Sequence, residues 1–401
     1  MNQKYRHGLI WSKASTLALA LALSGCSSQT PEDEKVGVHD GSLRGELDSY
    51  IATLDDGTSE TRHFLRIDGD ESNERRLIFV GDPDLAPGTR LKVWGVDTGE
   101  QIKVTEFEID REAKDIGSTS EALVGQAAYP NRTFAWIFVD IGGGAGTLTV
   151  DQARQRLIGM NPGDNSVKQY YREVSYGTQD ITAEFFEGSQ FSHAMASCDT
   201  SGMATALRPL ITTTFNHYLW YFRTRTSSCS WSGLAQLGTP QSPRRDTWYN
   251  GSSGCVVLVQ EPGHNFGMQH SSSMRCTGAS FADNPNGGTC THSEYGDRFD
   301  PMGGACDHMN AWQKAYQGWF GGCNSVKVGQ SGTYTLFPIE NACNGIQVLQ
   351  IPMPKSRQMT RSGGGGSAST DTLNFYYLEL RASYGFDANT INQVLVHVGG
   401  D

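Results

Sequence analysis

The stretch from Gln260 to His270 constrains this chain more than any other. It reads Gln-Glu-Pro-Gly-His-Asn-Phe-Gly-Met-Gln-His. In a helix, residues four apart share a face, so Gln260 and His264 point the same way and Glu261 lies beside them. Gly267 tolerates a positive φ, which lets the chain turn and bring His270 back as a third ligand. The pattern is the long zinc-binding motif H-E-x-x-H-x-x-G-x-x-H with glutamine in place of its first histidine.

A second segment, residues 295–303, fits the same kind of site. It reads Tyr-Gly-Asp-Arg-Phe-Asp-Pro-Met-Gly and places Met302 in a turn rich in glycine, proline and aspartate. Metallopeptidases with the long motif place a methionine in such a turn beneath the metal ligands. Met302 is therefore predicted to pack under the site without binding the metal.

Several phrases, in the same order along the chain, resemble the gametolysin-type zinc metallopeptidases, a secreted metzincin-like family. They are residues 170–177, 229–235, 247–251, 263–268, 294–297, 310–314 and 377–381. Several members of that family also carry glutamine where this chain has Gln260. The resemblance covers about residues 120–401. It implies an α+β fold in which a zincin/metzincin-like catalytic domain follows a small all-β domain and precedes a β-rich C-terminal region.

The resemblance also implies a function, a zinc-dependent endopeptidase acting on extracellular, cell-wall or matrix proteins and glycoproteins. Zn²⁺ would be held by Gln260, His264 and His270, three protein ligands that leave a position for water. Glu261 would take the proton of that water and pass it to the leaving amine. Peptide-bond hydrolysis is the expected reaction.

Two residues of the motif favour a different outcome. Gln260 offers a neutral amide oxygen, whereas Zn²⁺ prefers nitrogen or thiolate, so weaker binding or another divalent metal is expected. Pro262 removes a helical hydrogen bond and biases Glu261 away from helical dihedrals, so Glu261 is expected to be misplaced unless the helix starts after Cys255 or kinks. Both residues favour the alternative, a catalytically dead pseudoprotease that acts as a surface-binding lipoprotein.

The first 26 residues indicate export. A positive leader and a short apolar core end in Leu-Ser-Gly-Cys, a bacterial lipobox, which predicts lipidation of Cys26 and removal of everything before it. Ser27 after the lipidated cysteine favours the outer membrane or cell surface, with release to the medium as an option. The alternative is an ordinary signal peptide. The membrane is therefore a partner through Cys26 alone, and residues 27–44 form a flexible tether.

The remaining domain boundaries follow from changes in pattern. Residues 45–110 alternate apolar and polar positions between turn signals, which predicts a small β-domain, either a pro-segment or a permanent structural module. Residues 111–128 read as a linker, residues 129–325 as the catalytic domain, and residues 326–401 as a β-rich region with a disordered loop near 357–372. Within the catalytic part, a strand is predicted at 133–140, a helix from Val150, and an N-cap for a further helix at 164–166.

Charge and cysteine usage fit this interpretation. A net charge of −11 argues against a nucleic-acid partner. Apart from Cys26, the cysteines are Cys198, Cys229, Cys255, Cys276, Cys290, Cys306, Cys323 and Cys343. An even number in an exported chain predicts disulfides, with Cys276 and Cys290 as the best local pair. His292 and His308 lie near Met302 in sequence; a structural role is expected for each, with His308 the reserve ligand if Gln260 fails to bind.

Overall fold

The computed structural model describes residues 41–56, 58–68, 74–81, 83, 85–110, 131–143, 146, 148–161, 163–195, 197–277, 290–320, 324–342, 345–362, 368–388 and 392–400. Gly41–Asp401 forms one compact unit. The predicted signal peptide with Cys26, most of the tether and the linker at 111–128 lie outside the described residues.

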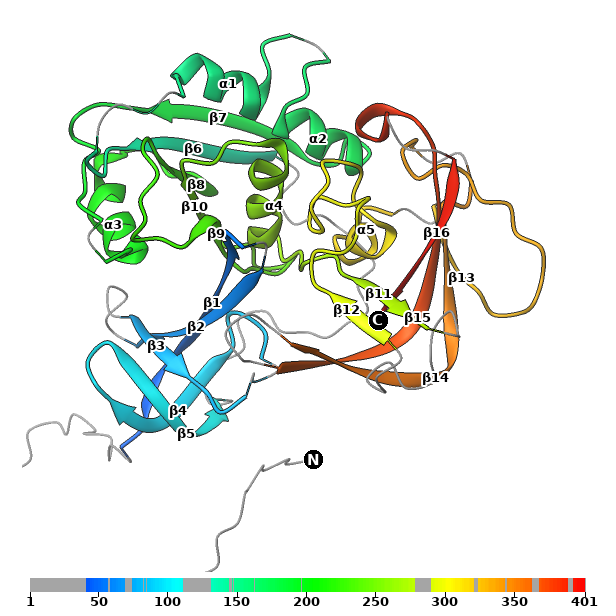
Figure 1. The fold of residues 1–401 in the computed structure, drawn as a ribbon, viewed down its shortest axis with the longest axis horizontal. Coiled ribbons are helices and arrows are strands. Elements are labelled where there is room, and N and C mark those ends of the chain that lie inside the picture. The colour runs from blue at the N-terminus through cyan, green and yellow to red at the C-terminus, as the bar shows by residue number, and fades with distance from the viewer. Residues whose placement is uncertain are drawn as a thin grey trace, which may run out of the picture. The chain divides into compact units, whose positions relative to one another are not determined.

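The N-terminal strands form a closed five-stranded β-barrel (Figure 1). These strands are β1 (Leu43–Leu54), β2 (Ser59–Ile67), β3 (Glu74–Ile78), β4 (Arg90–Asp97) and β5 (Gln101–Ile109). The order is β1-β2-β3-β5-β4, and β4 pairs again with β1 to close the ring. Alternation of apolar and polar residues sends one set of side chains inward, where Leu47, Leu65, Leu77, Leu91, Val93, Ile102 and Val104 make the barrel core.

Strand β1 belongs to the barrel and to a second group of strands. That group consists of β9 (Trp231–Gln236), β10 (Asp246–Asn250), β8 (His217–Phe222), β6 (Asn131–Val139) and β7 (Asp180–Phe186), in that spatial order. Because β1 pairs antiparallel with β9, the barrel and this group share one ten-stranded sheet. The strand predicted at 133–140 is β6, whose continuous apolar run is buried between two cores, as a central strand requires.

Short helices cover both faces of the sheet (Figure 1). They are α1 (Val150–Ile158), α2 (Val167–Val174), α3 (Thr200–Leu207), α4 (Cys255–Asn265) and α5 (Ala311–Tyr316), with 3₁₀ turns at Arg208–Leu210 and Gly385–Asp387. The helix predicted from Val150 begins there behind a capping box at Thr149, and Ser166 caps α2 as predicted. None of the helices in the described part of the chain is both long and apolar enough to cross a membrane.

The C-terminal part is a four-stranded sheet. Its strands are β13 (Ser325–Lys327), β14 (Val348–Ser362), β15 (Ala368–Arg381) and β16 (Gln393–Gly399), and a small hairpin of β11 (Ser273–Cys276) and β12 (Cys290–Ser293) precedes it. The prediction of a disordered loop near 357–372 is wrong for residues 357–362 and 368–372, which belong to β14 and β15. Pairs from Arg357↔Leu373 to Ser362↔Ala368 continue the β14–β15 hairpin, because alternating residues such as Met359 and Leu373 bury one face.

The predicted α+β class with a zincin/metzincin-like catalytic domain is also wrong. Strand accounts for 41% of the chain and helix for 16%, and the architecture is mostly β with the closed barrel at its start. The helices are short, six to eleven residues, because glycine, proline and runs of β-branched and aromatic residues interrupt helical periodicity. The barrel is also continuous with the sheet through β1, instead of preceding a helical domain as a separate module.

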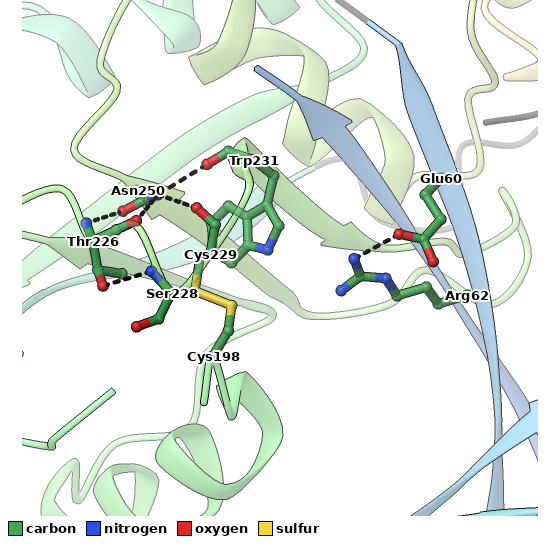
Figure 2. The surroundings of a disulfide bond; sticks show 8 residues. All are labelled: Glu60, Arg62, Cys198, Thr226, Ser228, Cys229, Trp231 and Asn250. Atoms are coloured by element: carbon green, nitrogen blue, oxygen red, sulfur yellow. Dashed lines mark hydrogen bonds and ion pairs between the residues drawn. A yellow bond between two sulfur atoms is a disulfide. The ribbon is translucent and has the colours of Figure 1, made fainter. Parts of the chain in front are cut away.

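Three disulfides brace the part of the chain that follows β7. They are Cys198–Cys229, Cys255–Cys306 and Cys276–Cys290, so the predicted local pair is confirmed. Cys323 and Cys343 lie outside the described residues. Figure 2 shows the first bridge, beside which the amide of Asn250 donates to the backbone carbonyls of Thr226, Cys229 and Trp231, each at 3.0 Å. This network fixes the start of β9, the strand that receives β1.

Candidate active site

Helix α4 carries the first half of the motif and runs without interruption through Pro262. The helix begins at Cys255 and ends at Asn265, with Pro262 inside it. A proline at this position costs about 3 kcal/mol because its ring replaces a hydrogen-bond donor. Tertiary contacts hold the helix in place: Asn265 donates to the carbonyls of Gln236 (2.8 Å) and Asp246 (3.0 Å), and Tyr171 donates to the carbonyl of Val259 (2.7 Å).

The turn after α4 is made as the motif predicts. The helix ends at Asn265, and Gly267 has φ +101°. A Cβ at Gly267 would lie 2.7 Å from the Cα of Thr239, so both the backbone conformation and the space require glycine. The turn brings His270 back towards the helix, and its ring centroid lies 4.8 Å from that of His264.

His264 has the environment of a metal ligand. The residue is fully buried, and burial, with a smaller contribution from the neighbouring His270, holds its pKa well below the usual range. The imidazole is therefore neutral, and its Nδ1–H donates to the carbonyl of Met268 at 2.8 Å. That bond fixes the tautomer and leaves Nε2, which is buried and has no hydrogen-bond partner among the described residues, as a lone-pair donor.

His270 is held in a comparable way by a carboxylate. Its Nδ1 lies 3.0 Å from Oε1 of Glu294, and its ring packs on Tyr295 with centroids 4.2 Å apart. The same Glu294 oxygen accepts a hydrogen bond from Ser59 of the barrel. A metal-binding histidine usually has its other ring nitrogen hydrogen-bonded to a carboxylate or a carbonyl, which orients the ring.

Gln260 completes the set from one turn before His264. Its side chain is buried, and its Nε2 has no hydrogen-bond partner within the described part of the chain. No cluster of three or more His, Cys, Asp or Glu side chains arranged to hold a metal occurs among the described residues. The candidate ligands are thus those of the sequence motif, the two imidazoles and the amide of Gln260.

Glu261, the predicted base, is enclosed. It is fully buried, and burial raises its pKa to about 8, while a hydrogen bond from Thr53 opposes the rise. The Thr53 hydroxyl donates to Oε1 at 3.1 Å, and Oε2 has no hydrogen-bond partner in the described ranges. A Cβ at Gly233 would lie 2.1 Å from Oε1, so only glycine lets β9 pass this close.

Met302 lies beneath the helix. It is fully buried, and a Cβ added at Gly263 would lie 3.0 Å from its sulfur, which places Met302 directly below the turn of α4 that joins Gln260 to His264. Asp300 accepts the amide of Met302 at 2.7 Å, and the carbonyl of Met302 accepts the amide of Ser271 at 2.9 Å. The Met302 turn is thus bonded to the residue that follows His270.

The structure brings the rings of His264 and His270 together, with centroids 4.8 Å apart, and this donor pair fits a divalent metal of borderline softness. Imidazole nitrogens suit zinc, copper, iron or nickel, while the amide of Gln260 is a weaker ligand that lowers the affinity for zinc. The buried Nε2 of His264 has no hydrogen-bond partner among the described residues, which leaves its lone pair available to a metal.

The other candidates lie elsewhere. His308 is buried, burial holds its pKa well below the usual range, and its Nε2 lies 3.4 Å from Glu173 of α2. His292 lies on β12 opposite Met274. A cavity of about 550 Å³ lies between the barrel, α3 and the sheet, and neither Gln260, Glu261, His264 nor His270 lines it.

Sequence reasoning missed the residues that surround the motif. Thr53 and Ser59 come from the barrel, and Glu294 and Tyr295 from the segment before Met302. Their local sequences carry no metal-site pattern, because these contacts depend on how β1 packs against β9. The one available signal was Glu294-Tyr295 within the phrases shared with the gametolysin-type peptidases.

Comparison with known proteins does not place the chain in a family. No known protein-family model matches the chain, and no curated protein is significantly similar to it in sequence. The functional argument therefore rests on the chain's own residues.

Proposed function

We propose that this chain is a metal-dependent endopeptidase, with zinc as the first candidate metal. The observation that carries the proposal is the joint placement of His264, His270 and Glu261: two imidazoles 4.8 Å apart, beside a carboxyl group one turn of helix away. Each ring has one nitrogen fixed by an acceptor, at Met268 and Glu294. That arrangement is suited to binding a cation and to moving a proton next to it.

The residues have separate roles in this proposal. His264 and His270 hold the metal through nitrogen, and Gln260 supplies the third ligand as an amide. Glu261 accepts a proton from the attacking water and returns it to the leaving amine. Met302 packs below α4 and keeps the ligand-bearing turn in position.

Bound zinc would supply Lewis-acid polarisation of the scissile carbonyl and activation of water. The remaining features come from the chain. Glu261 and His264 are fully buried, which strengthens electrostatic interactions, and the burial of Glu261 favours proton uptake near neutral pH. Substrates would be proteins or glycoproteins outside the cell.

Export and anchoring are part of the proposal. The lipobox at Cys26 would tether the chain to the outer membrane or cell surface through the lipid alone. The three disulfides support an oxidising compartment, where such bridges form and persist.

A second candidate function has a specific observation in its favour. Gln260 is an amide where zinc prefers imidazole, and Glu261 is enclosed by Thr53 and Gly233. These features favour a surface lipoprotein that binds a partner without turnover. Retention of Glu261 and of both oriented histidines favours the enzyme.

The deciding experiment uses the chain without residues 1–26. Metal content is measured on the same sample that is assayed for cleavage of an unfolded protein. We expect about one zinc per chain, cleavage that a chelator abolishes, and an inactive Glu261→Ala variant that keeps its zinc. Bound zinc with no cleavage would favour the binding lipoprotein.

A further inference from the structure

A cavity away from the candidate active site has walls rich in arginine. It lies between the barrel, α3 and the sheet, and its volume of about 550 Å³ is within the range of about 300 to 1,000 Å³ that small-molecule sites occupy. Its lining includes two carboxylates, Glu74 and Asp246, and five arginines: Arg66, Arg132, Arg208, Arg244 and Arg245. The arginines come from β2, β6, the 3₁₀ turn after α3 and the loop before β10. Elements far apart in sequence thus bring positive charge to one place.

The balance of charge around this cavity is opposite to that of the whole chain, which carries a net charge of −11. Glu46 and Asp48 pair with Arg66 and Arg244 at distances of 2.6 to 3.7 Å. Burial, and then the charge of Asp48, raises the pKa of Glu74 to about 7, so its carboxyl group is mostly neutral just below that pH. Five arginines then meet three ionised carboxylates, and the positive excess suits an anion.

Two residues of the cavity wall have an N–H group available to an acceptor. Arg208 donates through Nη2 to both carboxylate oxygens of Asp246 at 2.8 Å, and its guanidinium lies 4.3 Å from the ring centroid of Tyr218. Its Nη1 is buried without a hydrogen-bond partner among the described residues, and so is Nε1 of Trp248, which is 1% exposed. Arginine and tryptophan side chains are donors only, so a ligand that pairs with them has to supply acceptor oxygens. The wall thus favours an anion over a cation.

The wall is held in place without a ligand. The Cys198–Cys229 bridge lies just before α3 and just before β9 (Figure 2). Ser201 of α3 donates to the carboxyl group of Glu74 in the barrel at 3.0 Å. Side chains that are fixed in advance lose little conformational entropy when a ligand binds, which favours affinity.

We propose that this cavity binds a small organic anion that carries a phosphate or sulfate ester, with Arg208 and Trp248 as donors to its oxygens. The planar fork of a guanidinium matches the oxygens of such a group, and charge strengthens these hydrogen bonds. The volume leaves room for an organic part of about the size of a sugar. This site needs neither the metal nor the peptidase, because no residue from Gln260 to His270 lines the cavity. The alternative is a purely structural cluster of ion pairs between the barrel and the sheet.

The test titrates the metal-free chain without residues 1–26 with a set of small molecules in a calorimeter. Glucose 6-phosphate and glucose 6-sulfate carry the two kinds of ester, inorganic phosphate lacks the organic part, and glucose lacks the charge. We expect at least one of the esters to bind and glucose not to bind. The affinity should fall as salt is added, because the attraction is electrostatic. A preference for one ester over the other identifies the class of ligand.

Two neighbouring positions of α3 supply matched variants. Thr205 and Ala206 are both exposed, and of the two only Thr205 lines the cavity. Thr205→Glu adds a negative charge at the wall and should weaken binding of the ester about threefold or more, while Ala206→Glu should leave it unchanged. Arg208→Gln removes the guanidinium and should weaken binding at least about tenfold. Its partner Asp246 is buried, so Thr205→Glu decides the question if Arg208→Gln fails to fold.

Binding of neither ester would overturn the anion site. Equal affinities of the original chain and Thr205→Glu would also overturn it, because the anion would then bind elsewhere. Equal losses in Thr205→Glu and Ala206→Glu would do the same, since overall charge would then explain them. Inorganic phosphate that binds as tightly as glucose 6-phosphate supports the oxyanion as the recognised group. The titrations depend on neither zinc nor cleavage, so the anion site and the peptidase can fail separately.

Discussion

The hydroxyl of Thr53 donates a hydrogen bond to the carboxylate of Glu261, joining the barrel to α4 across 208 positions of sequence. This contact places the end of a barrel strand against the residue with the strongest claim to be a proton acceptor. Glu261 is fully buried although it lies near β9, the outermost of the five strands that follow the barrel. The barrel strand β1 covers it there.

Gln260→His should strengthen metal binding. The substitution replaces an amide by imidazole one turn before His264, and zinc prefers the nitrogen ligand. We expect at least a tenfold gain in zinc affinity, which corresponds to about 1.4 kcal/mol, measured by competition with a chromophoric chelator. Gln269→His, which adds a histidine in the same segment beyond the end of α4, is the control. An affinity unchanged by Gln260→His would show that position 260 is not a ligand.

Glu294→Gln should weaken the site through His270. The substitution removes the carboxylate that contacts Nδ1 of His270. Loss of a hydrogen-bond partner that orients a metal ligand lowers metal affinity about 10-fold to 100-fold. Glu106→Gln, at an exposed position of the barrel, is the control. The same chelator competition gives the answer, and equal affinities for the two variants would remove Glu294 from the account of the metal site.

Glu74→Gln should change how stability depends on pH. Burial, and then the nearby charge of Asp48, raises the pKa of Glu74 from 4.5 to about 7, and Tyr50 and Ser201 donate to its carboxyl group. The folded chain therefore binds this proton more tightly than the unfolded chain. The resulting stability is present below pH 4.5 and is lost as pH rises through 7.

Relative to Glu74→Gln, the original chain should lose up to about 3 kcal/mol of unfolding free energy between pH 4.5 and pH 7. Urea unfolding at several pH values measures this difference, with Glu106→Gln as the control for a lost surface carboxylate. A difference that stays constant across this range would show that Glu74 is not held in its neutral form.

Removal of the Cys255–Cys306 bridge should lower stability and weaken the site. The bridge joins the first residue of α4 to a position just beyond Met302, and the two cysteines are 51 residues apart. Loop entropy predicts a loss of about 4 kcal/mol for the double alanine variant. The Cys276–Cys290 bridge, with a separation of 14, is the comparison, with an expected loss of about 3 kcal/mol.

Only the Cys255–Cys306 bridge joins α4 to the segment after Met302, so only its removal should also reduce zinc affinity. Unfolding free energies and chelator competition on both double variants test this. Equal zinc affinities in the two variants would mean that the helix keeps its position without the bridge.

Local features of this chain were predictable from its sequence because short-range chemistry decides them. Gly267 needed a positive φ to turn the chain after the helix, and Ser166 was available to cap α2. The pair Cys276–Cys290 flanks one loop, so its partners were near in sequence. In each case the decisive neighbours lie within a few residues or within one hairpin.

The fold class was not predictable in this way, because it depends on a long-range pairing. The alternation in residues 45–110 indicated a β-domain, but nothing in the local sequence showed that β1 would also pair with β9. Pro262 disfavours a helix locally, and hydrogen bonds from Tyr171 and Asn265, which come from long-range contacts, hold α4 in place. The enclosure of Glu261 by Thr53 follows from the same long-range contact.

The most direct test of the central claim is the rate at which the chain without residues 1–26 cleaves an unfolded protein with zinc present. The rate is compared with that of the same chain carrying Glu261→Gln, by counting new N-termini. We predict cleavage that requires zinc and falls about 10²-fold to 10⁴-fold when the proton acceptor is removed. Equal rates for the two chains, or cleavage that persists in a chelator, would contradict the assignment of Glu261 and the metal site.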